Sequence, residues 1–294
     1  MVHFNLNFDG FYTFEIPEIK TFHHFDFECK MKITAIIVTY NRPDALEVIL
    51  NSILMQNQLP YEVIIADDGS GEETAQLISK YEKDFPCRLK HVWQEDKGFR
   101  AAKIRNKAIK ESTGEYLFFS DGDLFFHSRF FHDLRRNIRP GLAVIGSRVF
   151  LKEEATTEIL QNQKAKNISC FSAKIEKNRL NGVRIPAASK LFQTKPFSEK
   201  LRGGLLCVPK KNVLDINGWN EDFTGWGKED TEIVARLCFY GTKIKKLKFA
   251  AITYHLWHPH LSRKRIEMNE ILLSDCLENK KNWCKNGLVK GEKI

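Results

Sequence analysis

Residues 34–70 read TAIIVTYNRPDALEVILNSILMQNQLPYEVIIADDGS, and this stretch decides the fold class. It contains two short apolar runs, at residues 35–38 and 63–65, separated by a helical pattern over residues 43–56. A second helical pattern follows at residues 72–83. Strands spaced in this way pair in parallel through right-handed crossovers. We therefore predict an α/β fold whose ligands bind beyond the carboxyl ends of the strands.

Polar residues follow each expected strand. Thr39-Tyr40-Asn41 ends the first run and Asp67-Asp68-Gly69-Ser70 ends the second, while Asp121-Gly122-Asp123 follows a later apolar run at residues 116–119, after a helical pattern at residues 101–110. Paired carboxylates suit Mg²⁺ or Mn²⁺, which also accept phosphate oxygens as ligands. A solvated turn is the alternative for Asp121-Gly122-Asp123, because Asp and Gly are ordinary turn residues.

Composition narrows the protein class. No apolar run in the 294 residues approaches the roughly 20 needed to span a bilayer, so we predict no transmembrane helix. Residues 1–30 lack a basic region followed by an apolar core and are not a secretory signal, so we expect a cytoplasmic location. The seven scattered cysteines lack zinc-type spacing and are expected to be reduced thiols.

The formal net charge of +9 concentrates late in the chain, at residues 243–248, 263–265 and 280–293. This excess predicts an acidic partner, for which an anionic membrane surface, nucleic acid and phosphorylated glycan all qualify. Together with the lack of a spanning helix, it predicts peripheral contact between residues 264–294 and an anionic membrane. A solvated, partly disordered tail is the alternative.

The second half of the chain changes character twice. Residues 152–200 are polar with little periodicity and suit a long loop or lid over a site, with disorder as the alternative. Regular patterns resume at Gly203-Gly204 and reach a helix expected to begin near Lys228. Its first turn contains Glu229-Asp230, which the helix dipole alone would favour. An amphipathic helix is predicted at residues 266–283.

The motifs together resemble a family. Residues 36–41, 67–70, 98–106 and 121–123 look like family 2 glycosyltransferases of the GT-A fold, in their usual order. Residues 218–221 through 225–230 are similar to a segment of β-1,4-galactosyltransferases and bacterial chondroitin polymerases. The resemblance covers about residues 33–260 and implies a GT-A type nucleotide-binding sheet with helices on both faces, plus an acceptor-binding carboxy-terminal subdomain.

The resemblance also implies a division of the chain. We expect an amino-terminal appendage at residues 1–30 and a nucleotide-sugar-binding half at residues 31–150. A variable loop or lid is expected at residues 151–202, and an acceptor-binding, catalytic half at residues 203–262. A basic helical tail at residues 263–294 completes the chain.

Several residues match the family's donor-binding positions. The resemblance implies that Thr39 and Asp67 lie at the base, where a carboxylate accepts the uracil imide hydrogen and favours uridine. Arg105 would lie near the diphosphate as a bidentate partner for oxyanions, and Asp121 near the ribose. Asn41 and Gly203 complete the set expected to bind the nucleotide sugar. A turn residue and a surface arginine are the alternatives for Asp67 and Arg105.

The resemblance implies a Mn²⁺ or Mg²⁺ cofactor held by Asp121 and Asp123, with Asp123 the more direct ligand. Two carboxylates rarely complete such a site, so we expect a third ligand from residues 254–260. His255 is the first choice and His258 the second, since imidazole suits Mn²⁺. A separate zinc site that includes His260, or simple aromatic packing, is the alternative for these histidines.

Asp230 is expected to be the catalytic base that deprotonates the acceptor hydroxyl, by the same resemblance. Glu229 would bind or orient the acceptor, Trp226 would lie against a sugar face, and Gly204 would allow close backbone approach. Trp226 in the core is the alternative.

The predicted reaction is inverting transfer from a UDP-sugar to a glycan or lipid-linked glycan acceptor, in bacterial lipopolysaccharide, capsule or surface polysaccharide synthesis. One transferase unit favours transfer of a single sugar, with polymerisation as the alternative. The rival predictions are a nucleotidyltransferase acting on sugar phosphates and a non-catalytic glycan-binding protein. We expect no specific nucleic-acid partner, and location in the cytoplasm or at the cytoplasmic face of the inner membrane.

Overall fold

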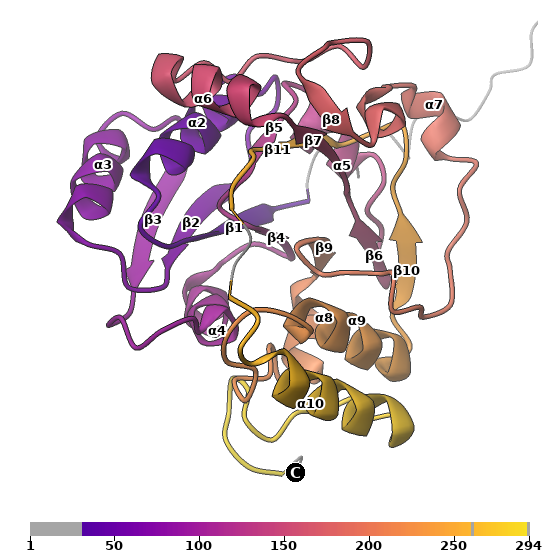
Figure 1. Cartoon of the computed structure of the whole chain (residues 1–294). Coiled ribbons are helices and arrows are strands. Elements are labelled where there is room, and N and C mark those ends of the chain that lie inside the picture. The colour runs from indigo at the N-terminus through magenta and orange to yellow at the C-terminus, as the bar shows by residue number, and fades with distance from the viewer. Residues whose placement is uncertain (1–30, 260–261, 293–294) are drawn as a thin grey trace, which may run out of the picture. The chain divides into compact units, whose positions relative to one another are not determined.

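The computed structural model describes residues 31–259 and 262–292, and its elements follow the α/β order expected from the sequence (Figure 1). The strands are β1 (Ile33–Thr39), β2 (Glu62–Asp67), β3 (Arg88–Trp93), β4 (Tyr116–Ser120), β5 (Leu124–Phe126), β6 (Leu142–Ile145), β7 (Ser147–Leu151), β8 (Ile175–Lys177), β9 (Leu205–Pro209), β10 (Lys243–Lys246) and β11 (Ile252–His255). The helices are α2 (Pro43–Leu54), α3 (Glu72–Glu82), α4 (Ala101–Glu111), α5 (Phe130–Arg135), α6 (Glu153–Asn162), the 3₁₀ helix η1 (Arg179–Gly182), α7 (Pro186–Ser189), α8 (Lys210–Asp215), α9 (Glu229–Tyr240) and α10 (Ile266–Glu278).

A mixed seven-stranded sheet forms the centre, in the order β10-β6-β9-β4-β1-β2-β3. β1 pairs in parallel with β2 and β4, so the three expected polar clusters leave the sheet at one edge. β9 lies antiparallel to both of its neighbours, β4 and β6. Gly203 and Gly204, which precede β9, therefore reach the edge at which β4 ends in the Asp121-Gly122-Asp123 turn.

A second sheet of four strands, in the order β5-β11-β7-β8, lies beside this edge. β11 pairs antiparallel with β5, so that His255 lies opposite Leu124. The Leu256 amide also donates to the Asp123 carbonyl oxygen over 2.9 Å. This pairing carries the histidine segment to the end of β4, although more than 130 residues separate the two in the sequence.

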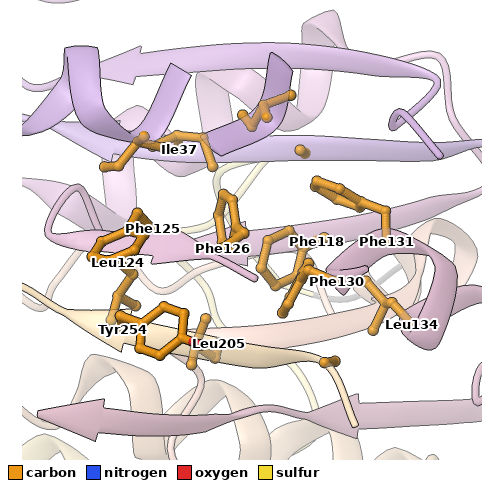
Figure 2. Close-up of a cluster of buried hydrophobic side chains, with 14 of the residues drawn as sticks. Ile37, Phe118, Leu124, Phe125, Phe126, Phe130, Phe131, Leu134, Leu205 and Tyr254 are labelled. Atoms are coloured by element: carbon orange, nitrogen blue, oxygen red, sulfur yellow. The ribbon is translucent and has the colours of Figure 1, made fainter. Parts of the chain in front are cut away.

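Helices cover both faces of the large sheet, as predicted. On one face α4, α8 and α9 pack against residues such as Ile36 and Phe119. On the other face, α2 and the second sheet enclose an aromatic core that includes Phe118, Phe126 and Phe130 (Figure 2). Because the β1 and β4 side chains alternate between two apolar layers, both strands are buried along almost their whole length.

Two expected segments differ from the sequence analysis. Residues 152–200 are not one irregular loop, because α6 packs on α2 and β8 joins the second sheet. The carboxy-terminal helix ends at Glu278, and the chain beyond it packs back: Asn217 donates to the carbonyl oxygens of Cys284 and Val289. The predicted appendage at residues 1–30 lies outside the described residues. No helix within the described ranges is long and apolar enough to cross a membrane.

Candidate active site

The Asp121-Gly122-Asp123 turn follows β4 at the edge where the polar clusters meet. A Cβ atom on Gly122 would collide with the carbonyl oxygen of Val38 at the end of β1, so a side chain there would force the turn away from β1. The two carboxylates point to different partners, and they build two adjoining groups of charged residues.

Arg105 is the centre of the first group. It extends from α4, and its side chain is only 3% exposed. Its guanidinium bonds Asp121 over 3.0 Å and lies 3.6 Å from Glu229 and 3.7 Å from Asp230. Burial opposes its charge, but the three carboxylates raise the pKa of Arg105 above its ordinary value. The buried ring of Trp219 supports the guanidinium from 4.2 Å. Arg105 is therefore not the surface residue of the alternative interpretation.

Arg148 belongs to the same group, although the sequence analysis did not identify it. It extends from β7 and donates to the second oxygen of Asp121 over 3.1 Å. Gly204 faces this contact: a Cβ atom there would collide with the Arg148 guanidinium and lie 2.5 Å from Asp121 and 2.9 Å from Asp230. The amide of the preceding residue, Gly203, donates to the Asp230 carbonyl oxygen over 3.0 Å. The only sequence signal for Arg148 was a charged residue inside an apolar strand pattern.

The carboxylates of this group titrate unusually. Burial raises the pKa of Asp121 to about 6, despite the attraction of Arg148 and Arg105. Burial and the neighbouring Asp230 raise the pKa of Glu229 to about 7. Glu229 also accepts a hydrogen bond over 3.1 Å from the amide of Gly227, which precedes α9. Glu229 lies in the first turn of α9, where the helix dipole favours a carboxylate, and its contact with the acceptor remains a prediction.

The second group can hold a metal ion. Asp123, His255 and His258 each offer one ligand atom, and these atoms lie within 4.8 Å of one another. Both imidazole Nε2 atoms face the same Asp123 oxygen, over 3.2 Å from His255 and 3.0 Å from His258. Burial opposes ionisation of Asp123, yet hydrogen bonds from both imidazoles hold its pKa well below the usual range.

The donor set fits a divalent transition metal. The other Asp123 oxygen is buried without a hydrogen-bond partner, and two imidazoles with a carboxylate suit Mn²⁺ or Zn²⁺ better than Mg²⁺. Asp121 does not join this group, because both of its oxygens bond arginines. Its role as a metal ligand remains a prediction. His260 lies outside the described residues.

At the expected nucleotide end, Asp67 has a structural role. One carboxylate oxygen accepts from the Gly69 and Ser70 amides, and the other contacts His91 Nε2 over 3.0 Å. Asp67 is completely buried, so its contact with a base stays a prediction. Asn41 connects this turn to β1 by accepting from the Gly71 amide. The Thr39 hydroxyl is buried without a hydrogen-bond partner, and its contact with a nucleotide stays a prediction.

Trp226 lies before α9, half-buried rather than in the core. The Arg263 guanidinium covers its ring from 5.5 Å. This residue is therefore only partly accessible, and its contact with a sugar remains a prediction.

Two family models match successive, overlapping parts of this chain. The family described as Glycosyl transferase family 2 matches residues 34–198, and the one described as the N-terminal domain of galactosyltransferase matches residues 184–259. Hyaluronan synthase of Pasteurella multocida is 27% identical over 240 residues, covering 76% of this chain and 24% of the relative. Chondroitin synthase of Escherichia coli is 25% identical over 244 residues, covering 76% of this chain and 34% of the relative.

The chain thus spans about a quarter to a third of the length of these relatives. Among solved structures, Staphylococcus aureus TarS 1–349 in complex with UDP-GlcNAc superposes with a TM-score of 0.57 at 18% identity, over 83% of this chain and 66% of that one. The mannosyltransferase PcManGT from Pyrobaculum calidifontis, in complex with GDP-Man and Mn²⁺, gives 0.54 at 17% identity, over 85% and 73%. At these identities the structures establish the shared GT-A fold.

Proposed function

This chain belongs to glycosyltransferase family 2, and from that premise we propose that it transfers a sugar from a UDP-sugar to a glycan hydroxyl with inversion at the anomeric carbon. The observation that carries the proposal is the Arg105 group, in which Asp121 from β4 meets Glu229 and Asp230 from α9 beside the Asp123-His255-His258 group. A donor-side cluster and an acceptor-side carboxylate pair therefore share one arginine.

Asp230 is the proposed base. Its side chain is 20% exposed, against 9% for Glu229, so an incoming hydroxyl reaches Asp230 more readily. Arg105 lies 3.7 Å from the buried Oδ1 of Asp230 and holds the carboxylate in place, so the other oxygen, which faces Gly204, would accept the acceptor's proton. Glu229 and Trp226 would orient the acceptor sugar from the same end of α9.

Asp123, His255 and His258 would hold a divalent cation, which supplies positive charge to neutralise the departing diphosphate. Arg105 and Arg148 add fixed positive charge beside Asp121. Thr39, Asn41 and Asp67 line the end of β1 and β2, where the nucleotide would lie. This pattern supports a nucleoside diphosphate leaving group.

A UDP-sugar is the proposed donor, because the related TarS structures contain UDP and UDP-GlcNAc. The proposed acceptor is a glycan or lipid-linked glycan in bacterial surface-polysaccharide synthesis, in line with the hyaluronan and chondroitin synthases among the relatives. We place the reaction at the cytoplasmic face of the inner membrane, where lipid-linked acceptors reside.

The test is metal-dependent release of UDP from UDP-glucose, UDP-galactose and their N-acetylamino forms, with mixed glycan acceptors. Wild type should release UDP from one donor with Mn²⁺, and both Asp123→Ala and Asp230→Asn should lose this activity. Asp84→Asn, which changes an exposed carboxylate, should not. Release of pyrophosphate would indicate a nucleotidyltransferase instead. Retained turnover in Asp230→Asn would remove Asp230 from the base role.

A further inference from the structure

The surface formed by residues 170–192 is unusual in its exposed apolar side chains. Phe171 is 92% exposed, Leu191 80% and Leu180 78%, which makes them the three most exposed large apolar residues of the described chain. Ile185 adds a fourth at 50%. These residues come from β8, η1, α7 and their connections, and Figure 1 places the labelled β8 and α7 at the same end of this part of the chain.

The apolar residues are held on an ordered backbone. Arg179 donates to the carbonyl oxygens of Cys170, Ser172 and Ile175, and so ties the Phe171 segment to η1. The Ile185 amide donates to the Phe249 carbonyl oxygen over 2.8 Å, which fixes the start of α7. The side chains are therefore presented by a structured support, although they bury little surface of their own.

This surface is also basic. Residues 170–192 contain five Lys or Arg against one Glu, a net charge of +4. Three of these cations have carboxylate partners, in the pairs Lys174–Glu158, Lys177–Glu176 and Arg184–Asp133. Burial, Arg139 and Lys190 lower the pKa of Lys245, which reflects the positive potential beside α7. Within the described residues, no carboxylate lies within ion-pair distance of Lys190.

The carboxy-terminal segment is also less available to a partner than the sequence suggested. Lys281 pairs with Asp275, Lys285 with Glu292, and Lys290 with Glu221. Three of the seven Lys and Arg residues at 264–294, the range that pointed to a membrane, are thus paired within the chain. Residues 284–290 also pack on Asn217, so deletion of residues 264–294 would disturb the fold.

We propose that residues 170–192 dock the protein on an anionic lipid bilayer, with Phe171, Leu180 and Leu191 inserted among the headgroups and the surrounding lysines on lipid phosphates. Exposed aromatic and aliphatic side chains beside lysines favour a bilayer over a polyanion, because only a bilayer offers apolar contact behind its charge. η1 packs on β7 and β11, and Asn181 donates to the Arg148 carbonyl oxygen. The docked surface therefore adjoins the strands that carry Arg148 and His255.

Vesicle co-sedimentation tests this proposal with the full chain. Wild type should bind vesicles of phosphatidylglycerol mixed with phosphatidylcholine, and bind pure phosphatidylcholine at least about tenfold more weakly. The triple variant Phe171→Ser, Leu180→Ser and Leu191→Ser should lower binding on the order of tenfold or more. Its matched control is Met268→Ser with Ile271→Ser, which removes exposed apolar residues of α10 and should leave binding unchanged.

Charge is tested separately. Lys177→Gln with Lys190→Gln should weaken binding by about fivefold per lysine, whereas the exposed pair Lys83→Gln with Lys110→Gln should not. Melting temperatures and release of UDP with a water-soluble acceptor should match wild type in every variant, so failure here is separable from failure of the proposed function. Wild-type vesicle binding by the triple serine variant would overturn the proposal. The proposal would also fail if only the lysine variants lost vesicle binding, because that outcome indicates a surface that binds polyanions in general.

Discussion

Replacing Gly204 with alanine is expected to inactivate the site while leaving the fold intact. The new Cβ atom would lie 2.5 Å from an Asp121 oxygen and 2.9 Å from an Asp230 oxygen, and would collide with the Arg148 guanidinium. Ordinary contacts between such atoms are about 3.5 Å, so Asp121 must move by roughly 1 Å and Asp230 by roughly 0.6 Å. Misplacement by about 1 Å costs on the order of a hundredfold in rate.

The stability cost should be small by comparison. The colliding atoms are the ends of side chains that can rotate, and Gly204 is not among the glycines with positive φ, so an alanine backbone is compatible. Overpacking of about 1 kcal/mol or more is partly offset by the lower entropy of the unfolded alanine chain. A change in melting temperature of only a few degrees is therefore expected.

The assay compares kcat/KM for release of UDP with the melting temperature of each variant. Gly71→Ala is the matched control, because no atom lies within 4 Å of its Cβ position and its φ is −73°. We expect Gly204→Ala to lose about a hundredfold in kcat/KM and Gly71→Ala to retain wild-type activity. A folded Gly204→Ala enzyme with more than half of wild-type kcat/KM would refute the reasoning that close packing at this residue positions the carboxylates.

Three further changes test other contacts. Arg105→Lys should lower kcat/KM at least about a hundredfold in steady-state kinetics, because one ammonium group cannot contact Asp121 and the α9 carboxylates at the same time. The control Arg88→Lys, at an exposed arginine, should leave kcat/KM unchanged. Glu229→Gln should raise the free energy of unfolding, measured in urea, on the order of 2 kcal/mol at pH 8 but not at pH 4. The folded pKa of Glu229 is about 7, above its unfolded value, so the wild-type protein loses stability as pH rises from about 4.5 to 7. An equal effect at both pH values would contradict this. Asn217→Ala should lower the free energy of unfolding by about 3 kcal/mol and expose residues 280–292 to protease, because three hydrogen bonds are lost. The control Asn178→Ala, at an exposed residue that also has a positive φ, should lower it much less, and equal losses would assign the effect to backbone strain alone.

The local pattern of apolar residues was sufficient to predict the strands and helices of the parallel half of the sheet. The β-branched runs at residues 35–38 and 63–65 become β1 and β2, and the helices that follow them, α2 and α3, begin and end within a few residues of the prediction. Each of these elements has a period that its own sequence displays. The match over residues 34–198 confirms the resemblance to family 2 glycosyltransferases. This resemblance could be recognised from the sequence because it rested on several motifs in a fixed order rather than on single residues.

Long-range pairing was less predictable. β9 enters the sheet antiparallel between β4 and β6, and β5 is only three residues long, so neither has a distinctive period. Arg148 reaches the site only because β7 pairs with β11, which in turn pairs with β5 beside Asp123. A charged side chain in a short strand gives no sign of which carboxylate it will meet. The packing of residues 284–290 on Asn217 is likewise a contact across the chain that composition does not reveal.

The two carboxylates of Asp121-Gly122-Asp123 acquire opposite pKa shifts, and this difference separates their roles. Burial raises the pKa of Asp121 to about 6, and repulsion from Asp230 reinforces it against two arginines. Asp123 is equally enclosed, but two imidazoles donate to it and hold its pKa low. Near neutral pH Asp123 is therefore a permanent anion with one unpartnered oxygen, as a metal ligand requires. Asp121 instead depends on Arg105 and Arg148 for its charge, so loss of either arginine should leave it largely protonated.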